Sequence, residues 1–356
     1  MTNNEFPISK PYLKTKSLFP ENQETPISFI ERDSVDHPLF YRRNHFSYPR
    51  LSHHNYWLPI NGAIKKPKIF SLKEIQQLPA KTIKVVLECS GNKRKFFKPP
   101  VFGEQWGNGA ISQGYWKGVP LRILIEKTEL KDDAKEVIVV GYDFGKNPGI
   151  DGIHHFARSL PLEKALHPDT IIAYEYNQKP IPFKHGYPLR LIVPGWYAMA
   201  SVKWIQQIIV TDSKFDGPFQ SMEYVYYPYK DSNHDSAPVT IMNVNSTIQK
   251  PHNGQILDSG KHMIKGIAWT GMGTIQMLEV STDNGQTWSK AAIKKDHHKG
   301  YGWVSWFYEW SAFKKGEYTI LSKATDSYNR SQPMSPVWNQ KGYGYNGVDC
   351  IRVKVE

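Results

Sequence analysis

The chain contains few cysteines and no long apolar run. Cys89 and Cys350 are the two cysteines among 356 residues, and they lie far apart in the sequence. No disulfide framework is implied, which excludes a small disulfide-stapled scaffold and suits a reducing compartment. No apolar stretch reaches the roughly 18 residues that a membrane-spanning helix needs. The sequence therefore predicts a protein without a membrane span.

Export signals are also missing from the N-terminal region. Residues 1–30 are polar and interrupted by prolines, without the apolar segment of a secretory signal. The Arg42-Arg43 pair lies deep in the chain and precedes Asn-His, so it does not form a twin-arginine export signal. We expect a cytoplasmic protein, on the assumption that no leader has been removed.

Length and composition indicate a folded protein of two domains. A chain of 356 residues exceeds a typical single domain, and 13% aromatic with 22% charged residues is typical of globular proteins. The net charge of +12 predicts attraction to anions. Because the basic residues are dispersed, with short clusters at 65–68 and 93–98, we expect small anions rather than nucleic acid as partners.

Short strands with a few brief helices are expected in the first domain. Residues 1–50 look like an extended arm, and a capping box at Ser71 and Glu74 begins a helix that ends near Gln77. Strands are expected at Thr82–Leu87, Glu136–Tyr142, Ile171–Tyr176, Leu189–Val193 and Val202–Val210, and helices at Leu121–Lys127 and Leu162–Leu166. This pattern predicts an α+β domain that is mainly β.

The pattern changes near residue 232. Strands are expected at Val239–Ile248, His262–Trp269, Ile275–Ser281, Trp303–Trp310, Tyr318–Ala324 and Asp349–Val355. Asp283-Asn284-Gly285 predicts a hairpin turn, since Asn and Gly tolerate positive φ. The absence of a helical pattern favours an immunoglobulin-like β-sandwich. We therefore expect domains at residues 1–231 and 232–356.

Cys89 stands at the end of an expected strand, in the segment Glu88-Cys89-Ser90-Gly91-Asn92-Lys93-Arg94. A thiolate beside fixed positive charge can bind a metal or act as a nucleophile. Cysteine is also among the most buried residue types, so an inert core thiol remains an alternative. Cys350 lacks such a context and is expected to be a packing residue.

Several motifs occur in a fixed order on either side of Cys89. They are Tyr41-Arg42-Arg43-Asn44-His45, Trp106–Ser112, Leu160-Pro161-Leu162, Ala173–Asn177, His185–Arg190, Pro194-Gly195, Val202-Lys203-Trp204, Ser281–Trp288 and Pro336–Asn339. The series resembles the sulfite oxidase family of molybdopterin enzymes, in its bacterial form without a haem domain. That family also includes assimilatory nitrate reductases. The resemblance extends from about residue 40 to residue 355 and implies a molybdopterin-binding domain followed by a dimerisation domain.

The resemblance implies a molybdenum ion bound by Cys89 together with the dithiolene of one pterin. A soft thiolate suits a metal that sulfur already holds. The positions that match cofactor-binding residues are Asn44, His45, Asp143, His185, Arg190, Ser201, Val202 and Lys203. The match of Asp143 is looser, because extra residues lie between it and Ser159; an ordinary turn residue is the alternative.

The resemblance also implies a substrate pocket for a small oxyanion. Arg43 and Arg94 match two pocket arginines, and Trp106 matches a tryptophan that lines the pocket. The catalytic tyrosine falls on Tyr224, although Tyr226 and Tyr227 stand close by. Guanidinium groups suit an oxyanion because they donate two parallel hydrogen bonds.

Position 341 departs from the family pattern. Lys341 stands where a third pocket arginine is expected, in Trp338-Asn339-Gln340-Lys341. Lysine keeps the charge and loses the forked geometry, so this exchange is not conservative at a bidentate site. It indicates weaker sulfite binding or a different oxo-substrate.

The predicted activity is oxidation of sulfite to sulfate by oxygen-atom transfer at a Cys-ligated Mo-oxo centre. Electrons are expected to pass to an external acceptor, because no haem domain is recognised, and the resembled family forms homodimers. A molybdenum-dependent reductase of nitrate, a sulfoxide or another oxo-substrate is the first alternative. A non-catalytic binding protein is the second.

Overall fold

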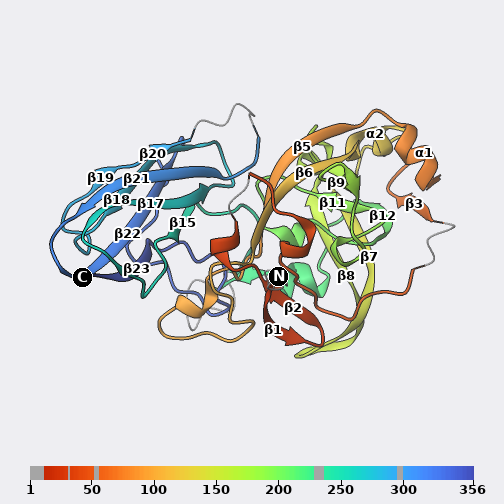
Figure 1. The fold of residues 1–356 in the computed structure, drawn as a ribbon. Coiled ribbons are helices and arrows are strands. Elements are labelled where there is room, and N and C mark those ends of the chain that lie inside the picture. Colours follow the sequence, from red (N-terminus) through yellow and green to blue (C-terminus); the bar gives the residue numbers. More distant parts are fainter. Residues whose placement is uncertain (1–11, 31–32, 52–55, 228–235, 295–299) are drawn as a thin grey trace, which may run out of the picture.

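Two lobes lie side by side in the computed structural model, which describes residues 12–30, 33–51, 56–227, 236–294 and 300–356. Figure 1 shows the first lobe from red to green and the second from teal to blue. The predicted fold class, a mainly β first domain followed by a β-sandwich, is confirmed. The predicted boundary between residues 231 and 232 lies outside the described residues.

Two five-stranded sheets form the first lobe. One contains β10 (Lys179–Pro180), β9 (Ile171–Tyr176), β6 (Ile111–Pro120) and β5 (Lys81–Glu88) in this order, with β11 (Arg190–Ile192) paired to β9. The other contains β4 (Lys68–Ser71), β3 (Trp57–Gly62), β12 (Ile205–Thr211), β7 (Glu136–Asn147) and β8 (Ile150–Pro161). A shared apolar core that includes Val86, Leu191 and Ile208 joins them. Both sheets contribute side chains to one hollow: Arg190 comes from β11 and Asp143 from β7.

Helices are short and lie where the sequence predicts them. They are α1 (Leu72–Gln77), α2 (Leu121–Glu126) and α3 (Leu162–Leu166). The capping box is present: the Glu74 amide donates to Ser71 Oγ at 3.2 Å, and the Ser71 amide donates to Glu74 Oε2 at 2.7 Å. Single 3-10 turns occupy Ile27–Phe29, His37–Leu39, Arg94–Phe96, Phe183–His185 and Ala198–Ala200, and a π-helical turn occupies Phe219–Glu223.

The second lobe is a sandwich of two sheets. One contains β15 (Asn245–Lys250), β17 (Gly260–Trp269), β21 (Val304–Ala312) and β20 (Ala292–Ile293); the other contains β16 (Ile256–Leu257), β23 (Asp349–Val355), β22 (Gly316–Asp326), β18 (Ile275–Ser281) and β19 (Ser289–Lys290). The predicted turn at Asn284 and Gly285 has positive φ at both residues, but it leads from β18 to the short β19. Cys350 is exposed, so its expected packing role is wrong: side chains alternate along β23, and Ile351 faces inward instead.

Several local predictions differ from the structure. The expected extended arm contains a hairpin of β1 (Lys14–Leu18) and β2 (Glu21–Glu24). The first expected strand of the second domain begins at Asn245 rather than Val239, and β13 (Val225–Tyr226) pairs with β14 (Ala237–Pro238) before it. Strand β12 begins at Ile205 because Trp204 adopts a φ of 49°, which interrupts extended backbone.

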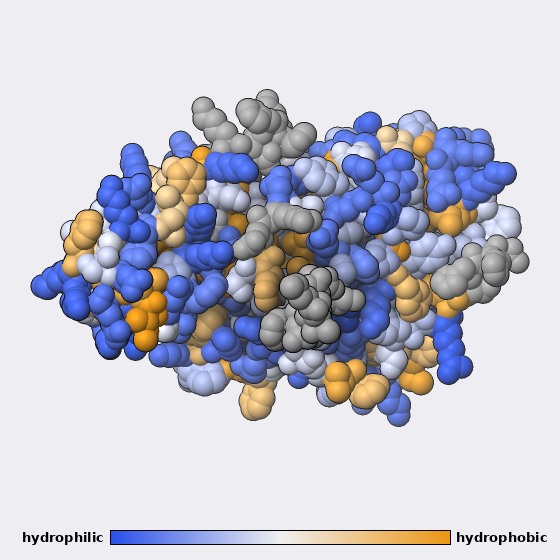
Figure 2. Space-filling model, viewed as in Figure 1, coloured by the Kyte–Doolittle hydropathy of each residue, from blue (hydrophilic) through white to orange (hydrophobic). Residues whose placement is uncertain are grey.

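Hydrophilic residues cover most of the face drawn in Figure 2, and the hydrophobic patches on it are small and scattered. No helix among the described residues is long and apolar enough to cross a membrane. Buried side chains accordingly gather inside the two lobes and at their junction, where Trp269 and Trp303 join the core of the first lobe.

Candidate active site

Cys89 lies where β5 leaves the core. The apolar residues Val85–Leu87 of this strand are fully buried. Cys89 comes directly after the strand, and 7% of its surface is exposed. Its amide donates to Ala110 O at 2.9 Å, and the Asn92 amide closes a turn on Cys89 O at 2.8 Å. These bonds fix the backbone that presents the thiol.

The Cys89 thiol faces two connected hollows. An inner hollow is lined by residues of the first lobe, and an outer hollow adjoins it at the junction of the lobes. Cys89, Arg43 and Tyr224 line both. A group held by Cys89 would therefore contact the contents of both hollows.

Burial dominates the acidity of this thiol. It raises the pKa of Cys89, while the charges of Arg43 and Arg94 and the Gly91 amide oppose the rise. The basic neighbours lower the pKa of the thiol, but burial outweighs them. Coordination to a metal would supply the missing stabilisation, since a bound thiol loses its proton.

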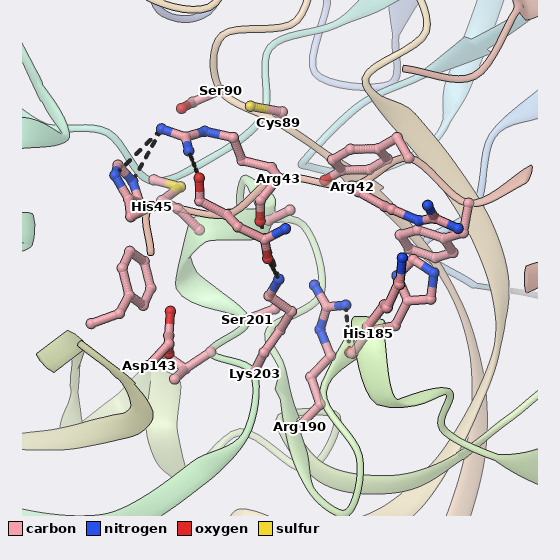
Figure 3. Close-up of a pocket in the computed structure, with 18 of the residues that line it drawn as sticks. Arg42, Arg43, His45, Cys89, Ser90, Asp143, His185, Arg190, Ser201 and Lys203 are labelled. Atoms are coloured by element: carbon pink, nitrogen blue, oxygen red, sulfur yellow. Dashed lines mark hydrogen bonds between the residues drawn. The ribbon is translucent and has the colours of Figure 1, made fainter. Parts of the chain in front are cut away.

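All predicted cofactor-binding residues line the inner hollow. They are Asn44, His45, Asp143, His185, Arg190, Ser201, Val202 and Lys203. Figure 3 shows that Cys89 and Arg190 lie on opposite sides of this group, with Arg43 beside the cysteine. The looser match at Asp143 thus falls in the same cavity as the firmer matches.

Cations and one carboxylate determine the charge of the inner hollow. Lys203 Nζ donates to Arg43 O at 3.1 Å and to Asn44 Oδ1. Burial lowers the pKa of Lys203 to about 7, and the nearby Asp143 opposes that change. Burial likewise raises the pKa of Asp143 to about 6, with Lys203 opposing. Both groups lie in a poorly solvated space, where an ionic ligand could bind to their charges.

Four buried polar atoms of residues that line this hollow lack a partner in the described part of the chain: Arg42 Nε, Ser90 Oγ, Asp143 Oδ1 and Arg190 Nε. Arg190 Nη1 donates to His185 O at 3.0 Å, but Arg190 Nε has no partner. Asp143 Oδ1 is likewise unpaired. Buried polar groups are almost always hydrogen-bonded, so these atoms indicate a bound ligand with both acceptors and donors.

Tyr224 connects the inner hollow to the outer one. Its hydroxyl lies 2.7 Å from His45 Nε2. Burial, followed by the charges of Arg43 and Lys203, holds the pKa of His45 well below its usual value, so this imidazole is neutral near pH 7. Burial raises the pKa of Tyr224, which keeps the phenol protonated and able to donate.

Arginine 94 is fixed by the loop that follows the sandwich strand β22. Arg94 Nε donates to Gly342 O at 3.2 Å, Nη1 donates to Glu104 O at 3.2 Å, and the guanidinium lies 4.9 Å from the ring centre of Tyr343. Arg94 therefore lines the outer hollow in a fixed orientation, although part of its hydrogen-bonding capacity is already used.

Lys341 also lines the outer hollow. Its Nζ donates to Met222 O at 2.6 Å and lies 3.9 Å from Glu223 Oε2. Lys341 thus lines the same hollow as Arg43 and Arg94, and the Glu223 carboxylate lines it too; a contact between Lys341 and substrate stays a prediction.

Trp106 occupies a different place from the other predicted site residues. It is fully buried in the apolar cluster that contains Cys89, and it lines neither hollow. The Lys95 amide donates to Trp106 O at 3.2 Å. Trp106 therefore supports the Cys89 segment from the core, and a direct contact with substrate stays a prediction.

Sequence reasoning missed three positively charged residues at or beside the site. Arg42 and Lys184 line the inner hollow and both bind Glu21, at 2.5 and 3.0 Å respectively. Their positions beside Arg43 and His185 were a usable signal. Arg158 lies 5.6 Å from the ring centre of Tyr224 and donates to Phe219 O, and nothing in the local sequence indicates this.

Comparison with known proteins assigns both lobes. Residues 45–219 match the family model "Oxidoreductase molybdopterin binding domain", and residues 236–356 match "Mo-co oxidoreductase dimerisation domain". Mitochondrial sulfite oxidase of Drosophila melanogaster is 32% identical over 96% of this chain, which spans 63% of that relative's length. Sulfite oxidase of Gallus gallus is 30% identical over 94% of this chain and 76% of its own length.

More distant relatives share the same framework. The NADH nitrate reductase of Solanum lycopersicum is 28% identical over 94% of this chain and 40% of its own length. Among solved structures, the sulfane dehydrogenase SoxCD of Paracoccus pantotrophus matches with a TM-score of 0.82 at 24% identity, covering 98% of this chain and 92% of its own; this likeness concerns the fold. The chain belongs to the sulfite oxidase family of molybdopterin-dependent oxidoreductases.

Proposed function

We propose that this protein oxidises sulfite to sulfate with a molybdenum cofactor whose metal is bound by Cys89. One observation carries the proposal: the Cys89 thiol lies where a cation-lined inner hollow meets an outer hollow lined by Arg43, Arg94 and Lys341. The first hollow suits a phosphate-bearing pterin, and the second suits a small oxyanion. Sulfite oxidase relatives at 30–32% identity support the choice of substrate.

The residues of the inner hollow fit this cofactor. Arg42, Lys184, His185 and Arg190 provide donors for a phosphate, and the unpaired Arg190 Nε is one of them. The unpaired Asp143 Oδ1 suits the N–H donors of a pterin ring. Bound there, the cofactor would supply a metal that transfers an oxygen atom and accepts two electrons.

The side chains of the outer hollow bind and orient the anion. Arg43 and Arg94 donate charge-assisted hydrogen bonds to sulfite, and Lys341 adds a third positive charge. The Tyr224 hydroxyl is a hydrogen-bond donor at the boundary of the two hollows. In the protein without substrate, its partner is the neutral His45 ring. Sulfite and water yield sulfate, two protons and two electrons, and the electrons leave to an external acceptor.

A second candidate is reduction of nitrate, a sulfoxide or another oxo-substrate by the same cofactor. Lys341 favours it, because its Nζ already donates to Met222 O and lies near Glu223. A pocket that contains this carboxylate is less suited to a dianion than one lined by three arginines. Similarity to a plant nitrate reductase also supports this candidate.

We further propose a cytoplasmic homodimer. The match of residues 236–356 to a dimerisation domain supports pairing through the sandwich, for which we propose the immunoglobulin-like type. Both cysteines are free, as expected in a reducing compartment. The proposed domain limits remain residues 1–231 and 232–356.

Metal analysis of the purified protein tests the proposal. The protein is made in cells that synthesise the pterin, and molybdenum is measured by mass spectrometry for the parent, Cys89→Ser and Cys350→Ser. We expect about one molybdenum per chain in the parent and in Cys350→Ser, and its loss in Cys89→Ser. Turnover assays with sulfite and with nitrate then separate the two candidates. A parent without metal would leave a non-catalytic binding protein.

A further inference from the structure

We propose that Lys93 is a positioning residue through which the second lobe holds the Cys89 loop, defined as residues 88–94. The sandwich would then fix the metal-binding thiol in addition to any role in dimerisation. The inference rests on the proposed function of Cys89 as metal ligand. Its evidence is a set of hydrogen bonds that cross between the lobes on both sides of that cysteine.

Lys93 is fully buried, and its ammonium group is bound entirely by the sandwich. Nζ donates to Asn245 Oδ1 at 2.9 Å and to Ser246 O at 2.7 Å, and it lies 3.2 Å from Asp349 Oδ1. It also lies 5.8 Å from the ring centre of Trp269. An ammonium has three N–H donors, so strands β15 and β23 supply a complete set of acceptors.

A second connection reaches the loop on the other side of Cys89. The Glu88 carboxylate is buried, and Trp269 Nε1 donates to its Oε2 at 2.8 Å. Its other oxygen accepts from Asn92 Nδ2 at 3.0 Å, which closes the loop upon itself. The residues before and after the cysteine are therefore joined to one another and to the end of β17.

Backbone groups of the segment after β22 add two more bonds. The Gly344 amide donates to Ser90 O at 2.7 Å, and Gly342 O accepts from Arg94 Nε at 3.2 Å. The first lobe binds the same loop as well: the Cys89 amide donates to Ala110 O, the Ala110 amide donates to Asn92 Oδ1 at 3.1 Å, and Arg94 Nη1 donates to Glu104 O at 3.2 Å. The second lobe binds the side chains of Glu88, Lys93 and Arg94, and it alone binds the ammonium of Lys93 among the described residues.

The backbone of Lys93 adopts an uncommon conformation. Its φ is 64° and its ψ is 12°, a left-handed conformation that is uncommon for residues other than glycine. A buried charge is tolerated only while its partners stay in place. Loss of the ammonium would leave Asn245 and Asp349 without their shared donor and would release the loop that carries Cys89.

Thiol alkylation of the full-length chain tests this inference without the cofactor. The chain is produced in cells that cannot make the pterin, and iodoacetamide labelling of each cysteine is followed by peptide mass spectrometry. Exposed Cys350 is the internal reference for buried Cys89. In Lys93→Met, which keeps an apolar stem, we expect Cys89 to react about tenfold faster, because its loop opens locally, and Cys350 to react at the parent rate. An unchanged ratio of the two rates overturns the inference.

A matched lysine of the sandwich controls for general loosening. Lys323 on β22 pairs with Glu279 at 2.9 Å and lies 4.5 Å from the ring centre of Trp288. Lys323→Met should leave the ratio unchanged, and an equal increase there would contradict a specific role for Lys93.

If Lys93→Met does not fold, the same ratio of the Cys89 and Cys350 alkylation rates is measured for Asp349→Asn. It removes the negative partner of Lys93 and keeps the size of the side chain, so a faster Cys89 supports the inference and an unchanged ratio overturns it. Because the chain carries no cofactor in this assay, the result is independent of whether the loaded enzyme oxidises sulfite.

Discussion

The proposed role of Tyr224 leads to a quantitative prediction for Tyr224→Phe. The change deletes one hydroxyl, which lies 2.7 Å from His45 Nε2, and keeps a ring that is 3% exposed and stacked 5.4 Å from Tyr343. A buried neutral hydrogen bond contributes about 1 kcal/mol to stability. For a chain of this size, that loss lowers the melting temperature by about 2 °C.

The expected effect on catalysis is larger. A donor directed at the reacting centre typically contributes about 100-fold to kcat, which corresponds to about 2.7 kcal/mol of transition-state stabilisation. We therefore expect Tyr224→Phe to lower kcat for sulfite about 100-fold while the protein stays folded and keeps its molybdenum. Steady-state rates with ferricyanide as a one-electron acceptor, together with a thermal melt, measure both quantities.

A neighbouring tyrosine provides the control. Tyr226 lies two residues along the chain, lines neither hollow, and loses a comparable hydrogen bond, to Tyr197, in Tyr226→Phe. Tyr226→Phe should have a slightly lower melting temperature than the parent protein and a kcat for sulfite within about twofold of the parent value. If Tyr224→Phe also stays within this range, or if Tyr226→Phe shows the larger loss, the assignment of Tyr224 is refuted.

Three further predictions concern the charges of the two hollows. Lys341→Arg should lower KM for sulfite about tenfold, because a guanidinium offers two parallel donors; an unchanged KM in steady-state assays would show that position 341 does not touch the anion. Glu223→Gln removes a carboxylate 3.9 Å from Lys341 Nζ and should lower KM about fivefold at low salt, with a smaller effect at high ionic strength. In the cofactor-free protein, burial raises the pKa of Asp143 from 3.8 to about 6, so the folded chain binds more protons than the unfolded chain between these values. Its free energy of unfolding should therefore fall by about 2–3 kcal/mol as pH rises through this window, and urea titrations of Asp143→Asn should lack that fall.

Local sequence determined much of the scaffold around the site. Alternation and β-branched residues indicated β5, β7 and β9, and the capping box located α1, because these signals arise between residues close in the chain. The motif around Cys89 and the His185–Arg190 motif likewise identified residues that meet in the inner hollow. The strand and helix predictions succeeded because each depends on short spacings that the chain itself fixes, whereas the residues of these two motifs were chosen from the family resemblance and their roles stay predictions.

Only the tertiary structure decided which distant groups surround those motifs. Arg158 lies behind Tyr224, and Lys93 is bound by strands about 150 residues or more further along the chain. Neither residue differs locally from an ordinary surface cation. Their roles depend on burial, because a charge removed from water must be satisfied by whatever groups the packing of the two lobes brings within reach. The sequence by itself determined the motifs and their order, and the meeting of the lobes determined how the Cys89 loop is held.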